Sequence, residues 1–327
     1  MEVFTLKILI TGGAGFIGSH LSKSLADKEE SVTVIDNLST GRYENIKPLV
    51  GYENFRFIVD SILNIETLEQ LIQDCDIIYH LAASVGVKRI VSKPVDTIET
   101  NVLGSHAVFS LAAKYNREVI LFSTSEVYGK NQNLPFKETD DCIFGTTMMS
   151  RWSYGCSKAV DEFLGLAYHK EQGLPVIIIR VFNMIGPRQT GVYGMVVPTF
   201  IRQALSGMPI TVYGDGTQSR CFTYVKDLVD TVVKFPKSRE CVGNIYNIGS
   251  EDEISINELA EKIKKKTHSK SEIVYIPYEK AYEQGFEDMN RRRPDISKIK
   301  KEFGFEPKVN LDNALDLIIE YEKKAIA

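Results

Sequence analysis

The feature that most constrains the fold is a glycine-rich turn between a short apolar run and a helical pattern. The run at residues 7–11 leads directly into Gly12, and Gly15 and Gly18 follow at intervals of three. Apolar residues then recur at helical spacing as far as Leu25. Glycines allow the backbone to turn sharply and to approach a pyrophosphate, which lies on the free amides of the helix N-terminus. The segment therefore predicts a strand, a phosphate-binding turn and a helix.

A second apolar run extends this pattern. Residues 32–35 form the run, and it ends in Asp36, about 20 residues beyond the turn. A carboxylate at this place in a dinucleotide-binding fold accepts the ribose hydroxyls of adenosine and repels a 2′-phosphate. Glycines alone are also compatible with an ordinary strand-to-helix turn. Together with Asp36, they predict NAD, rather than NADP, as the cofactor.

Strand-like runs alternate with helical patterns over the first half of the chain. The runs lie at 7–10, 31–35, 55–59, 76–79, 118–123 and 175–180. Such alternation requires crossover connections and predicts an α/β fold, a Rossmann-like doubly wound parallel sheet. We expect this domain over residues 1–181 and a smaller C-terminal α/β substrate lobe over residues 182–327. Within that lobe, residues 222–248 are expected to return to the main sheet.

Composition excludes several classes of protein. The net charge of −4 over 327 residues gives no electrostatic reason to expect nucleic acid or a membrane surface as a partner. The five cysteines are odd in number and form no CxxC pair, so neither a disulfide framework nor a metal site is expected. The N-terminus lacks a secretory signal pattern, and no apolar stretch reaches membrane-spanning length. We expect a cytoplasmic protein.

Tyr154 and Lys158 stand four positions apart and therefore share one face of a predicted helix. A lysine ammonium beside a phenol favours the phenolate. A free phenol has a pKa of about 10, and bringing it near neutrality takes about 3 units, or roughly 4 kcal/mol. Tyr154 is therefore a candidate base, although such a pair taken alone is usually just part of an exposed helix face.

Further motifs occur in a fixed order along nearly the whole chain. They are TGGAGFIG at 11–18, Asp36-Asn37, Asp60, HLAA at 80–83, NVLG at 101–104, the segments 123–129 and 154–158, RVFN at 180–183 and GPR at 186–188. In this order they resemble the extended short-chain dehydrogenases/reductases that modify nucleotide sugars. The resemblance implies an enzyme that uses NAD on a UDP-sugar. The cofactor positions that it implies are Gly12, Gly15, Phe16, Ile17, Gly18, Asp36, Asn37, Asp60, Leu81, Ala82, Ala83, Asn101, Tyr154 and Lys158.

The resemblance also implies a reaction at C4 of the sugar. The Tyr154 phenolate, with Thr124 holding the same oxygen, would remove the C4 hydroxyl proton as hydride passes to NAD. The resulting 4-keto sugar can be reduced from the other face, dehydrated across C5 and C6, or decarboxylated if C6 is a carboxylate. An intact Thr124, Tyr154 and Lys158 argues against a catalytically silent NAD-binding sensor, which is the alternative from another class.

Glu126 favours one of these branches. The family's 4,6-dehydratases carry Asp-Glu after the threonine, and Ser125 replaces the aspartate here, so the leaving hydroxyl would lack its acid. Thr124, Ser125 and Glu126 with the later Arg292 resemble instead the UDP-glucuronate decarboxylases, in which glutamate and arginine surround C5 and the C6 carboxylate. The pair Arg151 and Trp152, just ahead of Tyr154, is also like the bacterial members of that group, which make 4-keto pentoses. C5/C6 rearrangement of a UDP-amino sugar, a UDP-glucose or UDP-N-acetylglucosamine 4-epimerase, and a 4,6-dehydratase remain alternatives.

Substrate contacts and assembly follow from the same resemblance. Arginines suit a diphosphate because the guanidinium fork pairs with phosphate oxygens, and residues 130–151 form the expected lid over the sugar. The family packs two helices, here 96–115 and 154–171, against a twin subunit, which implies a homodimer. The substrate positions are Ser125, Asn183, Val197, Arg202, Tyr213, Arg220 and Arg292.

Overall fold

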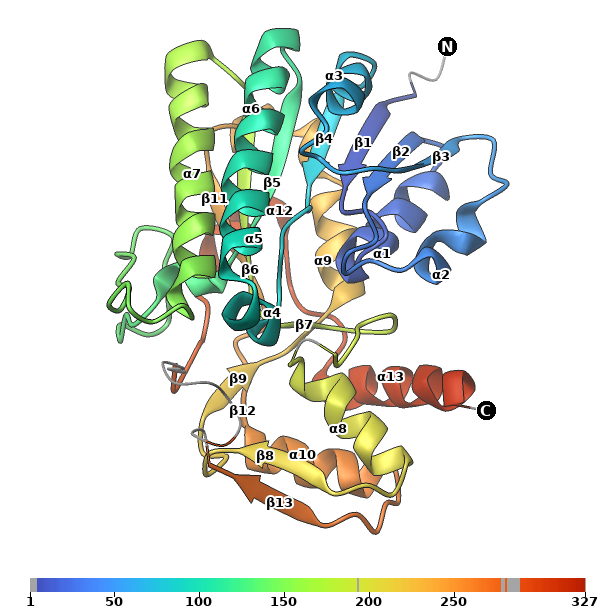
Figure 1. The fold of residues 1–327 in the computed structure, drawn as a ribbon, viewed down its shortest axis with the longest axis vertical. Coiled ribbons are helices and arrows are strands. Elements are labelled where there is room, and N and C mark those ends of the chain that lie inside the picture. The colour runs from blue at the N-terminus through green and yellow to red at the C-terminus, as the bar shows by residue number, and fades with distance from the viewer. Residues whose placement is uncertain (1–4, 193, 278–279, 281–288, 327) are drawn as a thin grey trace.

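A seven-stranded parallel sheet forms the larger lobe of the computed structural model, which describes residues 5–192, 194–277, 280 and 289–326. The strand order is β11-β6-β5-β4-β1-β2-β3 (Figure 1), and every neighbouring pair is parallel. The strands are β1 (Lys7–Thr11), β2 (Ser31–Asp36), β3 (Phe55–Val59), β4 (Ile77–His80), β5 (Glu118–Thr124), β6 (Val176–Val181) and β11 (Ile245–Ile248). The order reverses beside β1, where ligands bind in open α/β sheets. The predicted fold class is confirmed.

Helices cover both faces of this sheet. Alternate residues of β1 point to opposite faces: Ile8 packs in one core with α1, α9 and α12, and Leu9 in another with α3, α6 and α7. These helices are α1 (Phe16–Ala26), α3 (Ile65–Gln73), α6 (Gly104–Tyr115), α7 (Trp152–Gln172), α9 (Val225–Val232) and α12 (Ser297–Phe303). Burial on both faces explains why the strands consist of nearly continuous apolar runs.

The shorter helices connect these elements. They are α2 (Tyr43–Ile46), η1 (Lys47–Leu49), α4 (Val87–Ser92), α5 (Pro94–Ile98), the π-helical η2 (Glu99–Leu103), η3 (Ser125–Tyr128), η4 (Phe235–Lys237) and η5 (Arg239–Cys241). Among the described residues, no helix combines the length and apolar character needed to cross a membrane.

A smaller lobe lies below the carboxyl ends of the strands in Figure 1. Its apolar core joins α8 (Val196–Leu205), α10 (Ile256–Lys266) and α13 (Leu311–Ile326), of which α13 was not predicted. The parallel pair β8 (Ile210–Tyr213) and β13 (Ile273–Ile276) packs against them, and β9 (Ser219–Cys221) pairs antiparallel with β12 (Glu253–Ser255). The predicted capping box of Ser255 and Glu258 opens α10.

The chain passes between the lobes more than once. Two-residue strands β7 (Met184–Ile185) and β10 (Thr223–Tyr224) pair with each other, and β11 then pairs with β6 of the main sheet. The division at residue 181 stays a prediction. The carboxyl ends of the strands therefore face the smaller lobe, and the site lies between them.

Candidate active site

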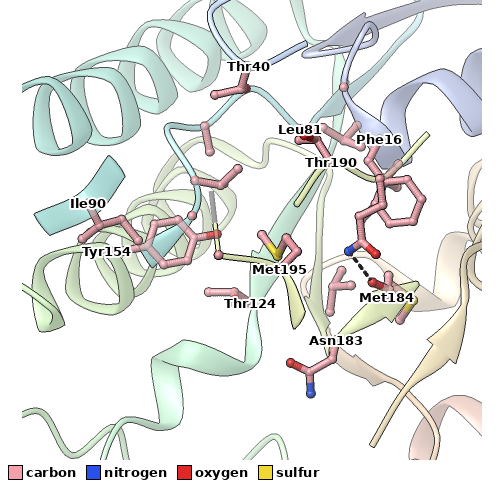
Figure 2. Close-up of a pocket in the computed structure, with 18 of the residues that line it drawn as sticks. Phe16, Thr40, Leu81, Ile90, Thr124, Tyr154, Asn183, Met184, Thr190 and Met195 are labelled. Atoms are coloured by element: carbon pink, nitrogen blue, oxygen red, sulfur yellow. Dashed lines mark hydrogen bonds between the residues drawn. The ribbon is translucent and has the colours of Figure 1, made fainter. Parts of the chain in front are cut away.

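A cavity of about 620 Å³ lies at this junction. The turn after β1 and the ends of β2, β4, β5 and β6 form its upper wall, and α8, β8 and β9 contribute from the smaller lobe. Figure 2 shows Tyr154 and Thr124 on one side of this space and Phe16 on the other. The cavity therefore spans the switch point of the sheet and continues into the smaller lobe, which is the shape that a two-part ligand requires.

The glycine turn forms one end of the cavity by backbone contacts. Gly12 has a φ of +73°, and a Cβ there would lie 2.8 Å from the Ala82 backbone nitrogen. A Cβ on Gly18 would lie 2.3 Å from the Gly12 carbonyl oxygen. Side chains at these two positions would therefore force the turn open. The start of α1 lines this end of the cavity, where its backbone amides can meet a phosphate.

Asp36 closes the same end of the cavity. Its carboxylate accepts hydrogen bonds from the backbone amides of Ala14 (3.0 Å) and Leu38 (2.8 Å). Burial raises the pKa of Asp36, and these two bonds oppose that effect. The glycine turn and this fixed carboxylate fit the diphosphate and adenosine ribose of NAD. Asn37, Asp60 and residues 81–83 also line this end.

Two predicted cofactor residues, Asn101 and Lys158, do not line the cavity. Asn101 lies in the π-helical turn η2, accepts from the Ser84 amide at 2.8 Å and donates to Ser157 Oγ at 3.0 Å. It therefore fastens the loop after β4 to α7. Lys158 is buried and pairs with Asp161 at 2.8 Å. Their predicted contacts with cofactor stay predictions.

Tyr154 points its phenol into the cavity near Thr124 (Figure 2). Burial raises the pKa of Tyr154, the Glu126 charge raises it further, and a hydrogen bond with Thr124 opposes the shift. This direction is opposite to the one predicted from the spacing of Tyr154 and Lys158. Burial is the largest cause, and the Lys158 ammonium, which the prediction placed beside the phenol, is directed one helical turn away, toward Asp161.

Glu126 lies on the cavity wall between two arginines. Arg151 Nη2 is 2.5 Å from Glu126 Oε2, and Arg292 donates to Glu126 Oε1. Burial acts to raise the pKa of Glu126, but the charges of Arg151 and Arg292 outweigh it and lower the pKa to about 2. The structure thus brings together the predicted pair Glu126 and Arg292. In this arrangement Glu126 is ionised and accepts, rather than donates, a proton.

Arg151 is a cavity residue that the sequence analysis noted but did not assign to the site. Its side chain is only 2% exposed although it is charged. Arg151 precedes Tyr154 by three positions, so the two share a face of the chain as it enters α7. That spacing is the sequence feature from which a place for Arg151 in the site could have been predicted. The cavity residues 189–192, 194 and 195 gave no signal in the sequence; among them, Gln189 donates to the Met184 carbonyl oxygen at 2.8 Å.

The predicted substrate residues divide into two groups. All except Arg202 line the cavity: Ser125, Asn183, Val197, Tyr213, Arg220 and Arg292. Arg202 is directed to the other side of α8, where its Nε donates to Glu322 of α13 at 2.7 Å. The geometry therefore gives Arg202 a contact inside the smaller lobe, and its predicted role in substrate binding stays a prediction.

The fold and the cavity are those of a dinucleotide-dependent α/β enzyme. The chain belongs to the family described as GDP-mannose 4,6 dehydratase, whose sequence profile matches residues 9–318. This membership confirms the predicted resemblance and enzyme class, an NAD-dependent nucleotide-sugar enzyme of the epimerase, dehydratase and decarboxylase type.

Two relatives are similar over nearly the full chain. The UDP-N-acetyl-alpha-D-glucosaminuronate decarboxylase of Bacillus cytotoxicus is 45% identical over 316 residues, which cover 96% of this chain and 97% of the relative. The UDP-glucuronic acid decarboxylase 1 of Danio rerio is 39% identical over 315 residues, which cover 96% of this chain and 72% of the relative.

Solved structures of epimerases share the fold. UDP-glucose 4-epimerase from Thermotoga maritima, with UDP-glucose, has a TM-score of 0.89 and 31% identity and covers 98% of this chain and 100% of its own. UDP-glucuronic acid 4-epimerase from Bacillus cereus, in complex with UDP-glucuronic acid and NAD, has a TM-score of 0.88 and 30% identity with the same coverage.

Proposed function

We propose that this protein is an NAD-dependent UDP-uronate decarboxylase and that UDP-N-acetylglucosaminuronate is its substrate. The observation that carries the proposal is the buried cluster of Glu126, Arg151 and Arg292 beside Tyr154. The sugar follows from the relative with 45% identity. In this proposal residues 1–181 hold NAD, and the smaller lobe holds UDP.

The charge of the cluster suits a substrate with a carboxylate. Two guanidinium groups and one carboxylate leave one positive charge in a largely buried wall of the cavity. A buried charge without a counter-ion is costly. The C6 carboxylate of a uronate neutralises it and pairs with the guanidinium forks, whereas the CH₂OH of a neutral sugar leaves the charge in place.

Oxidation at C4 prepares the sugar for loss of the carboxylate. Tyr154, held by Thr124, takes the proton of the C4 hydroxyl. NAD, when bound, supplies the hydride acceptor at C4. The C4 ketone lies β to the carboxylate, so the electron pair of the breaking C5–C6 bond moves into the ketone and carbon dioxide leaves. No acid is needed for this step.

The remaining step is protonation of C5. When a substrate carboxylate pairs with Arg151 and Arg292, the two guanidinium groups divide their attraction between that carboxylate and Glu126. Their lowering effect on the pKa of Glu126 therefore becomes weaker. Glu126 can then take up a proton from solvent and deliver it to C5. Substrate binding therefore converts the ionised Glu126 into the acid that the reaction requires.

The test uses purified protein with four sugars: UDP-N-acetylglucosaminuronate, UDP-glucuronate, UDP-N-acetylglucosamine and UDP-glucose. We expect carbon dioxide and a UDP-pentose or 4-keto pentose from the uronates, with the N-acetylated uronate turned over fastest. Absorbance of NADH distinguishes the two products, because only the keto product leaves reduced cofactor behind. Turnover of the neutral sugars without release of carbon dioxide would contradict the proposal.

A uronate 4-epimerase is the second candidate. It is favoured by the similarity to the Bacillus cereus enzyme, which was solved with UDP-glucuronic acid and NAD. An epimerase must return hydride to the opposite face before the carboxylate is lost. The same assay separates the two, because an epimerase inverts C4 and releases no carbon dioxide.

We also propose a cytoplasmic homodimer. Five large apolar side chains are exposed along α5, η2 and α7: Val95, Ile98, Leu103, Val160 and Phe163. A second copy of the chain would cover them in the helix packing implied by the family resemblance. All five cysteines are free thiols, which suits a reducing compartment. Light scattering after size exclusion tests the dimer, and a monomer at micromolar concentration would contradict it.

A further inference from the structure

A buried ion pair behind Tyr154 has no role in the reaction described above. Lys158 Nζ lies 2.8 Å from Asp161 Oδ2, and the two side chains are 2% and 0% exposed. Tyr154, Lys158 and Asp161 follow one another along a single stripe of α7. The ammonium is bonded to the residue one turn toward the C-terminus, and Tyr154 lies one turn toward the N-terminus. In the part of the chain that the structure describes, no hydrogen bond joins Lys158 to Tyr154.

Asp161 is a costly residue to keep in this position. Its Oδ1 is buried and has no hydrogen-bond partner within the described residues. Burial raises the pKa of Asp161, while Lys158 and the nearby Ser105 hydroxyl act to keep it ionised. Ser105 is fixed in turn by His80 Nε2 at 3.0 Å. An incompletely satisfied buried carboxylate costs stability, so a functional reason for it is worth seeking.

The charged groups near Tyr154 occur in two ion-paired sets. The first contains Arg151, Arg292 and Glu126, and the second contains Lys158 and Asp161. His80, behind Lys158, has its pKa lowered to about 3 by burial and by the lysine charge, so it is neutral. Each positive group near the phenol is therefore already engaged by a carboxylate.

We propose that Asp161 is a positioning residue that holds the Lys158 ammonium away from Tyr154, so that the tyrosine becomes a base only when bound ligands draw the ammonium across. The inference rests on the proposed role of Tyr154 as the C4 base. Asp161 touches neither the cavity nor the reacting atoms, and it acts through Lys158. It keeps the charge of Lys158 compensated in the unliganded site and the phenol protonated.

Asp161→Asn removes the charge and keeps the shape. The ammonium then loses its anionic partner and turns to the phenol, and a negative charge near the phenol is also removed. Both changes lower the pKa of Tyr154. Because the base acts in its deprotonated form, the acid limb of the kcat/KM profile moves to lower pH, by about one unit. Ser105→Ala removes a hydroxyl that favours the ionised form of Asp161. It should therefore move the acid limb of the kcat/KM profile in the same direction, but by a smaller amount.

The experiment compares the holoenzyme and these two variants with Asp230→Asn, which removes an exposed carboxylate paired with Lys226 on α9. The first readout is the pH profile on UDP-N-acetylglucosaminuronate. The second needs no turnover: the near-ultraviolet absorbance of tyrosinate is titrated, and the same variant carrying Tyr154→Phe is subtracted. We expect both readouts to shift for Asp161→Asn and Ser105→Ala and neither to shift for Asp230→Asn.

The proposed function and the proposed role of Asp161 can be contradicted independently of each other. A wild type that turns over no uronate would sink the proposed function, and the absorbance titration would still test Asp161. If Asp161→Asn folds and the titration of Tyr154 is unmoved, the inference is overturned. A loss of turnover at every pH with no shift of either curve also overturns it, since that pattern shows a structural role alone. If Asp161→Asn does not fold, the Ser105→Ala titration decides.

Discussion

The two ends of the cavity are built in different ways. The cofactor end consists mainly of backbone, with the glycine turn after β1 and one carboxylate, Asp36, fixed by two amides. The sugar end consists of charged side chains, Glu126, Arg151 and Arg292, that meet from separate parts of the chain. The first end presents mainly backbone, which substitutions of single side chains change little. The second can change its chemistry through single substitutions on an unchanged fold.

The comparison also separates two energetic strategies. The cofactor end offers the backbone amides at the start of α1 and few charges, so binding there needs little rearrangement of charge. At the sugar end the charged side chains are paired with one another, and a bound substrate must rearrange these ion pairs. Specificity and proton transfer would therefore depend on the same residues. Substitutions at the two ends should therefore affect different measurements.

The largest effect is expected at the sugar end for Tyr154→Phe. Removing the hydroxyl that is proposed to take the C4 proton should lower turnover about 10³-fold and leave NAD affinity unchanged. Steady-state kinetics and a cofactor titration measure the two effects. Tyr168→Phe, on the same helix and stacked on Phe109, is the matched control. Comparable losses in both variants would mean that Tyr154 supports the fold rather than the reaction.

Glu126→Gln tests the ion pairs of Glu126 with the two arginines through the free energy of unfolding. Its depressed pKa means that Glu126 stabilises the fold fully above its unfolded pKa of 4.5 and loses that contribution as pH falls toward about 2. At pH 7 the variant should therefore be less stable by about 3 kcal/mol, and the difference should shrink on acidification to about pH 3. Urea denaturation at the two pH values measures it.

The control for this prediction is Glu320→Gln, which breaks an exposed pair with Lys324. It should show no pH-dependent difference, because solvent screens that pair. A Glu126→Gln variant as stable as wild type at pH 7 would show that the two arginines find other partners, and the proposed charge balance of the sugar end would then be wrong.

The contrast between the two ends also explains what the sequence could predict. The glycine turn and Asp36 lie within one strand–helix–strand unit, so their spacing determines their geometry. Tyr154 and Lys158 likewise share a helix face, but spacing does not specify which rotamer a lysine adopts. A carboxylate on the next turn, Asp161, pairs with the same ammonium, and burial is the largest cause of the raised pKa of Tyr154, which spacing along a helix does not report.

The geometry of the sugar end could not be predicted from local sequence patterns, because it depends on contacts between residues far apart in the chain. Glu126 and Arg292 are 166 residues apart in the chain, and only the family resemblance suggested that they meet. Arg202 lies on a helix that the sequence predicted, but the sequence did not predict the direction in which its side chain points. The unpredicted α13 supplies Glu322 on the far side of α8, and that partner draws Arg202 away from the cavity.

Arg151→Lys is expected to have the next largest effect. Lysine keeps the charge but loses the planar fork, so kcat/KM for the uronate should fall about tenfold to hundredfold with NAD affinity unchanged. Arg202→Lys provides the comparison, because Arg202 pairs with Glu322 outside the cavity, and its kcat/KM should not change. If instead Arg202→Lys weakens UDP-sugar binding and Arg151→Lys does not, the sugar end is assigned to the wrong arginine.

The smallest effect, and the one confined to the cofactor end, is expected for Gly18→Ala. The added Cβ would lie 2.3 Å from the Gly12 carbonyl oxygen, which is backbone and can move only if the turn opens. We expect about a tenfold loss of NAD affinity and no change in the pH dependence of turnover once cofactor is saturating. Gly104→Ala on α6 is the control, because its Cβ would meet the Ile62 side-chain terminus, which can rotate away. A pH profile altered by Gly18→Ala would show that the two ends are coupled through the turn and that the division drawn above does not hold.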